Sequence, residues 1–265
     1  MIDIRISRSR VFLPISLFFL LCAPLFSKST PAKGEQPTQK LASMLEAFLK
    51  LPEEDASLKK DGKNLWHHFC RKILHGKSSE IYPYHRIIFQ KEDKWEEYSI
   101  VKLKFLADIL TLIAPSMSIY LFKKQTALQM NYPFYFAQLL CRQGEIGKAQ
   151  KFIMPFIPKK NLHSLKIEDN LAVAEIFCTH RSEIFNFSLR AARLQIFLKR
   201  NKPENMLLHA WSFLLEAAHY ENRKVIKKKA DALHRARLLC AKKLILPGNA
   251  DINFLFNSWV KKLNK

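Results

Sequence analysis

Apolar residues recur at intervals of three and four along most of the chain, which is the spacing of one face of an α-helix. The first clear case combines Leu41, Met44, Leu45 and Phe48, and Pro52 ends that segment. Residues 81–92 have no definite period, so a short extended piece is an alternative there. Elsewhere the pattern predicts one helix after another.

The predicted helices are separated by proline, glycine or short polar stretches. Because such short connections join antiparallel neighbours, the pattern predicts an all-α fold of about ten amphipathic helices in antiparallel hairpins. The predicted ranges are 41–51, 61–75, 93–114, 116–128, 134–158 (two segments joined at Gly144), 165–179, 182–200, 203–218, 222–244 and 251–263.

Small residues are placed regularly within 134–158. Ala137 lies in the first segment, Gly144 between the two segments, and Ala149 in the second. On these three residues the unit from Phe134 to Pro158 resembles a tetratricopeptide repeat, in which small residues let two helices approach closely. The resemblance implies a right-handed superhelical stack of helical hairpins whose concave face binds a peptide or protein.

The unit also departs from that repeat. Pro133 replaces the aromatic residue at its start, Phe156 stands where a second small residue is usual, and the final proline comes early, at Pro158. No second copy follows at a period of about 34 residues. A short superhelical stack is therefore one form that the all-α fold could take.

The first thirty residues have the layout of a secretory signal peptide. Three arginines precede the apolar run Val11–Phe26, and two small residues, Ser27 and Ser29, follow it. The 16 residues of the run would form a helix of about 24 Å, shorter than the roughly 30 Å hydrocarbon core of a bilayer. We therefore expect export through the inner membrane to the periplasm or the medium, with an uncleaved single anchor as the alternative.

This layout divides the chain into a signal peptide at 1–29, a flexible leader at 30–39 and a single α-helical domain at 40–265. Lipid attachment at Cys22 fits less well, because large apolar residues precede it where a lipidated cysteine follows a small one. The domain retains four cysteines within apolar helical stretches, and we interpret them as buried thiols. Any of three disulfide pairings stays open for these four, Cys70, Cys141, Cys178 and Cys240.

The composition limits the class of protein. Apolar residues make up 48% and charged residues 25%, which excludes wholesale disorder and a polytopic membrane protein. With only 6 glycines in 265 residues, neither a β-rich fold with many tight turns nor a Gly-rich phosphate loop is expected.

Positive charge is concentrated at the C-terminal end. The chain has a formal net charge of +21, and residues 223–265 hold twelve Lys or Arg against two Asp. On a helix over 222–244, four of these cations fall within about 40° of one another, opposite Ile226, Ala230, Leu233, Cys240 and Leu244. We call these four residues the cationic ridge: Lys224, Lys228, Arg235 and Lys242.

A ridge of this kind suits an acidic protein or the anionic surface of a membrane. Nucleic acid is the least natural of the polyanions for an exported protein. The alternative is a solvated face of a Lys-rich protein without a binding role.

Two pairs of residues are candidates for chemistry. His67 and Cys70 are one helical turn apart and could face one metal ion, or they could belong to a helix that buries its apolar side. Glu175 and Glu216 each lie within an apolar helix and could supply the acid of a glycan-cleaving enzyme, or they could be paired with Lys or Arg. No sequence motif of nucleotide, metal or nucleophile chemistry occurs, so no cofactor is expected.

These observations favour an exported α-helical protein-interaction or scaffold protein of the bacterial envelope with a protein partner. The alternative is an envelope enzyme that acts on cell-wall glycan through a buried glutamate.

Overall fold

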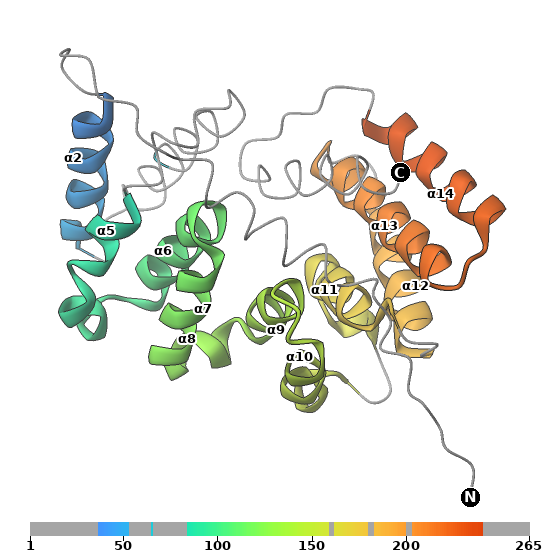
Figure 1. Ribbon diagram of the computed structural model, residues 1–265, viewed down its shortest axis with the longest axis horizontal. Helices are drawn as coiled ribbons and strands as arrows, with labels where there is room; N and C mark the ends of the chain where they lie inside the picture. The colour runs from blue at the N-terminus through green and yellow to red at the C-terminus, as the bar shows by residue number, and fades with distance from the viewer. Residues whose placement is uncertain are drawn as a thin grey trace, which may run out of the picture.

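The computed structural model describes residues 37–52, 65, 84–158, 162–179, 183–199 and 203–240. The predicted all-α class is confirmed: over these ranges the elements are helices, and consecutive helices pack antiparallel. Figure 1 shows them following one another along an arc from the first described helix to the last. The predicted signal peptide and Cys22 lie outside these ranges, as do His67, Cys70 and the helix at 251–263.

The first part of the arc is built from helices of unequal length. They are α2 (Pro37–Lys50), α5 (Tyr84–Phe89), the 3-10 helix η1 (Glu92–Glu97), α6 (Ile100–Ile113), α7 (Pro115–Lys124) and α8 (Thr126–Asn131).

The second part consists of three hairpins. Its elements are α9 (Pro133–Arg142), α10 (Ile146–Ile153), the 3-10 helices η2 (Met154–Phe156) and η3 (Leu162–Ser164), α11 (Ile167–Phe177), α12 (Glu183–Leu198), α13 (Pro203–Asn222) and α14 (Ile226–Cys240). Each hairpin pairs two consecutive helices: α9 with α10, α11 with α12, and α13 with α14. The first helices of the hairpins also pack against one another, α9 on α11 and α11 on α13.

Several boundaries differ from the prediction. The first helix begins at Pro37 rather than after residue 39, and proline suits a first helical position because it has no N–H to leave unpaired. Residues 84–89 are helical rather than extended. The helix predicted at 93–114 is divided at Ser99, whose extended backbone and side chain cap α6 by accepting a hydrogen bond from the N–H of Lys102 (3.3 Å). The helix predicted at 116–128 is divided at Gln125, whose backbone is not helical.

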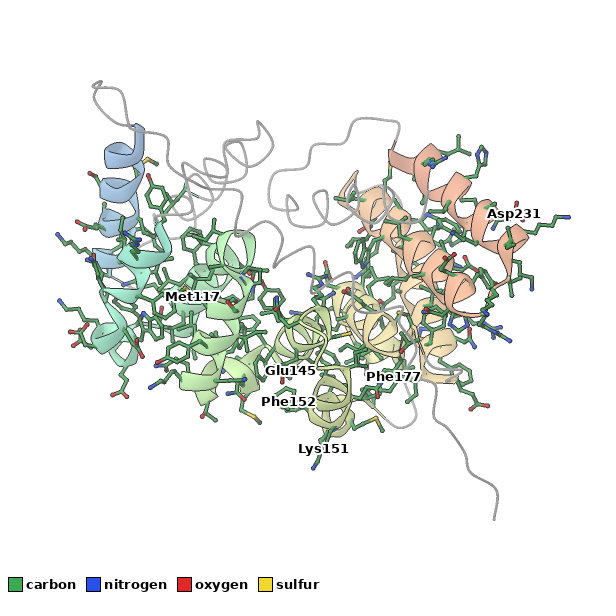
Figure 2. The ribbon with its side chains drawn as sticks, in the orientation of Figure 1. Met117, Glu145, Lys151, Phe152, Phe177 and Asp231 are labelled. Atoms are coloured by element: carbon green, nitrogen blue, oxygen red, sulfur yellow. The ribbon has the colours of Figure 1, made fainter. Side chains whose placement is uncertain are left out.

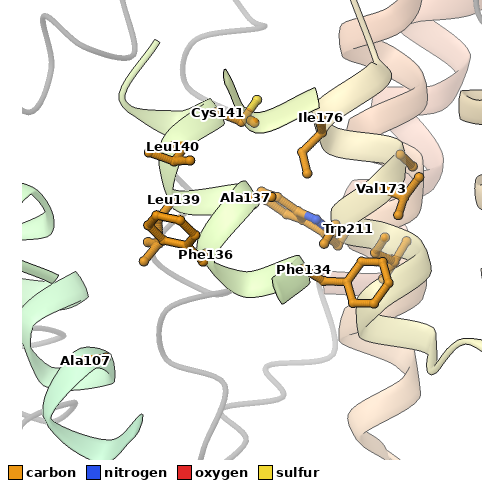
Figure 3. Packing of buried hydrophobic residues seen from close by; sticks show 14 of the residues in the cluster. Ala107, Phe134, Phe136, Ala137, Leu139, Leu140, Cys141, Val173, Ile176 and Trp211 are labelled. Atoms are coloured by element: carbon orange, nitrogen blue, oxygen red, sulfur yellow. The ribbon is translucent and has the colours of Figure 1, made fainter. Parts of the chain in front are cut away.

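One continuous cluster of buried apolar side chains links the described helices from α2 to α14. Where the three hairpins meet, Ala137 of α9, Val173 of α11 and Trp211 of α13 all contribute to it (Figure 3). Ala137 is completely buried, so the small residue at this position lets the neighbouring helices approach.

Two of the hairpins have the same connection. At Gly144 (φ 85°) the N–H bonds to the carbonyl three residues earlier (3.0 Å), and the next N–H bonds to the carbonyl five residues before it (2.9 Å). Around Lys224 (φ 57°) the corresponding bonds are 3.0 and 2.9 Å. A fully buried alanine precedes each turn by seven residues, Ala137 in one hairpin and Ala217 in the other. The second turn has no glycine, which is why the sequence pattern did not reveal it.

Candidate functional site

The cationic ridge is not a single helix face. Because α14 begins at Ile226, Lys224 lies in the turn before the helix, while Lys228 and Arg235 are exposed on the helix itself. Lys242 lies outside the described residues. The predicted helix start at 222 is therefore wrong, since the left-handed backbone of Lys224 separates α13 from α14.

The predicted apolar side of this helix is also partly wrong. Leu233 is buried as expected, but Ile226 is 79% exposed and Ala230 is exposed as well. The buried side consists of Ala232, Leu233 and Ala236. Small side chains on this face let α14 lie close to α13, and this places Lys228 and Arg235 beside the interface rather than opposite it.

A hollow of about 230 Å³ lies between α13 and α14. It brings Glu216, which the sequence offered as a catalytic acid, next to Lys228 and Arg235 of the cationic ridge. We call it the α13–α14 hollow, and its lining residues are Glu216, Tyr220, Lys228, Asp231, Ala232 and Arg235.

Glu216 is held by two neighbours. Its Oε2 accepts a hydrogen bond from Nη2 of Arg193 (2.7 Å), and its Oε1 accepts one from the hydroxyl of Tyr220 (3.3 Å). Arg193 belongs to α12 and also donates from Nε to Oγ of Ser212 (3.0 Å). This network joins α12 to α13 and neutralises the charge of Glu216 with that of Arg193.

The cations of the hollow lie over aromatic rings. Nζ of Lys228 is 5.6 Å from the centre of the Tyr220 ring, and Cζ of Arg235 is 5.8 Å from that of Phe213. Within the described part of the chain, neither cation makes an ion pair, and nor does Asp231 between them. Figure 2 shows Asp231 at the outer end of the molecule, on α14. Among the residues that the structure describes, no salt bridge thus neutralises the two cations of the hollow.

The surroundings shift the pKa of two groups here. Burial, followed by the charge of Glu216 and the hydrogen bond to it, raises the pKa of Tyr220 above its ordinary value. Tyr220 therefore remains protonated and continues to donate to Glu216 at neutral pH. Burial, followed by the charge of Arg193, lowers the pKa of His209, which favours the neutral imidazole.

Glu175 lies elsewhere, inside the packed hairpins. It is 3% exposed and accepts two hydrogen bonds from Arg142, from Nε to Oε1 (2.7 Å) and from Nη2 to Oε2 (3.0 Å). Nε2 of Gln138 donates a third (2.6 Å). Glu175 is thus a carboxylate paired with an arginine, which is the alternative to a catalytic acid. Both of its oxygens accept hydrogen bonds from protein donors.

Two of the four cysteines of the domain can be placed fully. Cys141 and Cys178 are both buried as thiols, in agreement with the interpretation made for them. Burial, followed by the charge of Glu175 and the neighbouring Cys178, raises the pKa of Cys141 well above its ordinary value. Such a thiol is a poor nucleophile at neutral pH.

Three residues of this region are not among the site residues predicted from the sequence. Tyr220 could have been found, because it follows Glu216 by four residues and shares its helix face. Asp231 could also have been found from the sequence, because it lies within about one helical turn of both Lys228 and Arg235. Arg193 could not have been found, since only the packing of α12 on α13 brings it to Glu216.

Three further findings concern metal sites, membrane spans and related proteins. Over the described ranges, no group of three His, Cys, Asp or Glu side chains is arranged to hold a metal ion. None of the helices in those ranges has the length and apolar character needed to cross a membrane. No family model, no curated protein and no solved structure matches the chain.

Proposed function

We propose that the protein is an exported, non-enzymatic α-helical scaffold of the bacterial envelope that binds a protein partner. The observation that carries this proposal is a row of exposed apolar side chains on α12. Phe187 is 53% exposed, Leu194 47%, Phe197 62% and Leu198 72%. We call these four residues the α12 stripe.

The α12 stripe occupies one side of the helix. At 100° per residue its four members fall within about 100° of one another over three turns. Large apolar side chains gathered on one exposed face are typical of protein–protein contacts, whereas apolar residues scattered singly need no explanation. Val101 and Met130 are examples of the scattered kind, on α6 and α8.

The arrangement of the hairpins supports the same proposal. The first helices α9, α11 and α13 pack in a row, and the connections at Gly144 and Lys224 are alike. These are features of stacked helical hairpins, in which each unit contacts its neighbours and the array offers an extended surface to a partner. A tetratricopeptide-like superhelix is the form of this stack that we propose.

The carboxylates argue against the enzymatic alternative. A glycan-cleaving acid needs access to the leaving group and the freedom to give up a proton. Both oxygens of Glu175 are held by Arg142 and Gln138 in the interior. Both oxygens of Glu216 accept hydrogen bonds as well, from Arg193 and Tyr220. Neither carboxylate is arranged as a free acid.

The test places a photo-cross-linking residue at Arg190, which is exposed on α12, in cells of the bacterium that encodes the protein. The cross-linked partner is identified and its affinity is then measured with the purified proteins. We expect the triple variant Phe187→Ser, Leu194→Ser, Leu198→Ser to lose the cross-link and at least tenfold in affinity. The control Val101→Ser, Met130→Ser removes equally exposed apolar residues elsewhere and should bind normally.

Two results would overturn the proposal. One is a partner that binds the triple variant and the wild type equally. The other is release of fragments from purified peptidoglycan by the wild type but not by Glu216→Gln, which would establish the enzyme instead. Fractionation of the same cells, with the mass of the exported chain, tests the signal peptide.

A further inference from the structure

We propose that the α13–α14 hollow binds an acidic segment of the partner by holding an Asp or Glu side chain between Lys228 and Arg235. The inference rests on the proposed function and adds the chemistry of the partner to it. The α12 stripe supplies apolar contact, and the hollow supplies a site that selects for a negative charge.

The charges within the hollow leave room for one carboxylate. Glu216 is neutralised by Arg193 at 2.7 Å, so the remaining charges are those of Lys228, Arg235 and Asp231. Their sum is one positive charge, which a single carboxylate balances. Among the described residues no acidic side chain forms an ion pair with either cation, so an incoming carboxylate displaces no salt bridge.

The geometry lets both cations reach the same ligand group. Lys228 and Arg235 are seven residues apart on α14, which places them on one side of the helix and about 10.5 Å apart along its axis. Both have long side chains, and the guanidinium of Arg235 can donate two parallel hydrogen bonds to a carboxylate. Their positions over the rings of Tyr220 and Phe213 restrict the directions they take and reduce the ordering that binding requires.

The hollow favours a peptide over a membrane surface. Its cations face a recess between two helices rather than a flat plane, and Asp231 lies between them on the same helix. A carboxylate at that position repels an incoming anion, whether a lipid phosphate or the carboxylate of a peptide. The same carboxylate can accept a hydrogen bond from a backbone N–H next to the acidic side chain of a peptide. The ring of Tyr220 offers a wall for the aliphatic part of that side chain.

The experiment measures fluorescence anisotropy of the exported chain with a labelled peptide of alternating Ser and Glu. A peptide of alternating Ser and Gln is the neutral comparison. We expect the Glu peptide to bind at least tenfold more tightly.

Lys228→Gln and Arg235→Gln should each weaken binding of the Glu peptide about fivefold, and Lys228→Arg should retain binding. Lys227→Gln is the matched control, because Lys227 is exposed on the same helix but does not line the hollow. Circular dichroism confirms that each variant is folded.

Two results would show that the hollow is only part of a solvated basic face. One is equal binding of the Glu and Gln peptides, and the other is an equal loss of affinity in Lys227→Gln and Lys228→Gln. Binding to vesicles that contain phosphatidylglycerol, without binding to the Glu peptide, would show that the hollow attaches the protein to a membrane and does not bind a peptide. Failure here can be told apart from failure of the proposed function. If only the peptide site in the hollow is wrong, Lys228→Gln and Arg235→Gln will still form the cross-link at Arg190. If the proposed function is wrong, the cross-link at Arg190 will form whether or not the α12 stripe is intact.

Discussion

Arg142 and Glu175 form an ion pair inside the interface between α9 and α11, where side-chain exposure is 10% and 4%. Their attraction is offset by the cost of removing both charges from water, so the pair adds little net stability. Removing only one partner is different, because the other charge is then buried without compensation. The pair therefore fixes how the two helices fit together more than how strongly they associate.

This asymmetry gives the first prediction. Arg142→Leu and Glu175→Leu should each lower the free energy of unfolding by about 3–5 kcal/mol, since each leaves one buried charge unpaired. The double variant should lose much less than the sum of the two. Urea denaturation of the four proteins at neutral pH measures this. Two small and additive losses would mean that water reaches the pair.

The Cys141 thiol gives the second prediction, which concerns alkaline pH. Because its pKa is raised in the folded state, the folded chain keeps a proton that the unfolded chain loses. The thiol's contribution to stability is complete below the unfolded pKa of about 9 and declines as the pH rises above it. Above that pH the free energy of unfolding should fall more steeply with pH in the wild type than in Cys141→Ala, by up to about 1.4 kcal/mol per pH unit. Parallel pH profiles would contradict the raised pKa.

At the scale of elements, the connections at Gly144 and Lys224 share one backbone conformation but differ in side chain. A left-handed backbone costs an ordinary residue about 1–2 kcal/mol, whereas glycine adopts it without steric penalty. Lys224 therefore stores strain that Gly144 avoids.

The third prediction exchanges the two residues. Gly144→Lys should destabilise the protein by about 1 kcal/mol, and Lys224→Gly should stabilise it by about 0.5–1 kcal/mol. Thermal unfolding monitored by circular dichroism should show opposite shifts in Tm. Shifts of the same sign would mean that side-chain contacts, rather than the backbone conformation, dominate these turns.

The elements also show how far the sequence determines the fold by itself. Helices with one buried face, such as α10 and α12, follow from the period of their apolar residues. Lys224 has no signal for a left-handed turn, so α13 and α14 were divided at the wrong place. The candidate site shows the same limit, because Glu216, Lys228 and Arg235 were recognisable one by one. Their meeting in one hollow depends on the packing of α13 against α14.

For the whole molecule, the continuous apolar core predicts stability without staples. A domain of more than 200 residues buries enough apolar surface for this, and Cys141 and Cys178 are buried as thiols. The fourth prediction is that reductant or chelator shifts the Tm of the chain from residue 30 onward by less than about 5 °C, which corresponds to 1–2 kcal/mol. A larger fall in Tm with reductant would reveal a disulfide elsewhere in the chain. A larger fall with chelator would reveal a bound metal, and His67 and Cys70 would then be the first residues to replace.

The arc of helices in Figure 1 leads to the fifth prediction, which concerns shape. A compact domain of about this length has a radius of gyration near 18 Å. Hairpins that pack in a row through α9, α11 and α13 extend the molecule instead, because each one is added beside its neighbour. Small-angle X-ray scattering of the chain from residue 30 onward should give a clearly larger radius and an asymmetric distance distribution. A chain that begins at Pro37 is the control for the contribution of the preceding residues. A symmetric distribution near 18 Å would mean that the arc closes in solution, and an extended binding surface would then be ruled out.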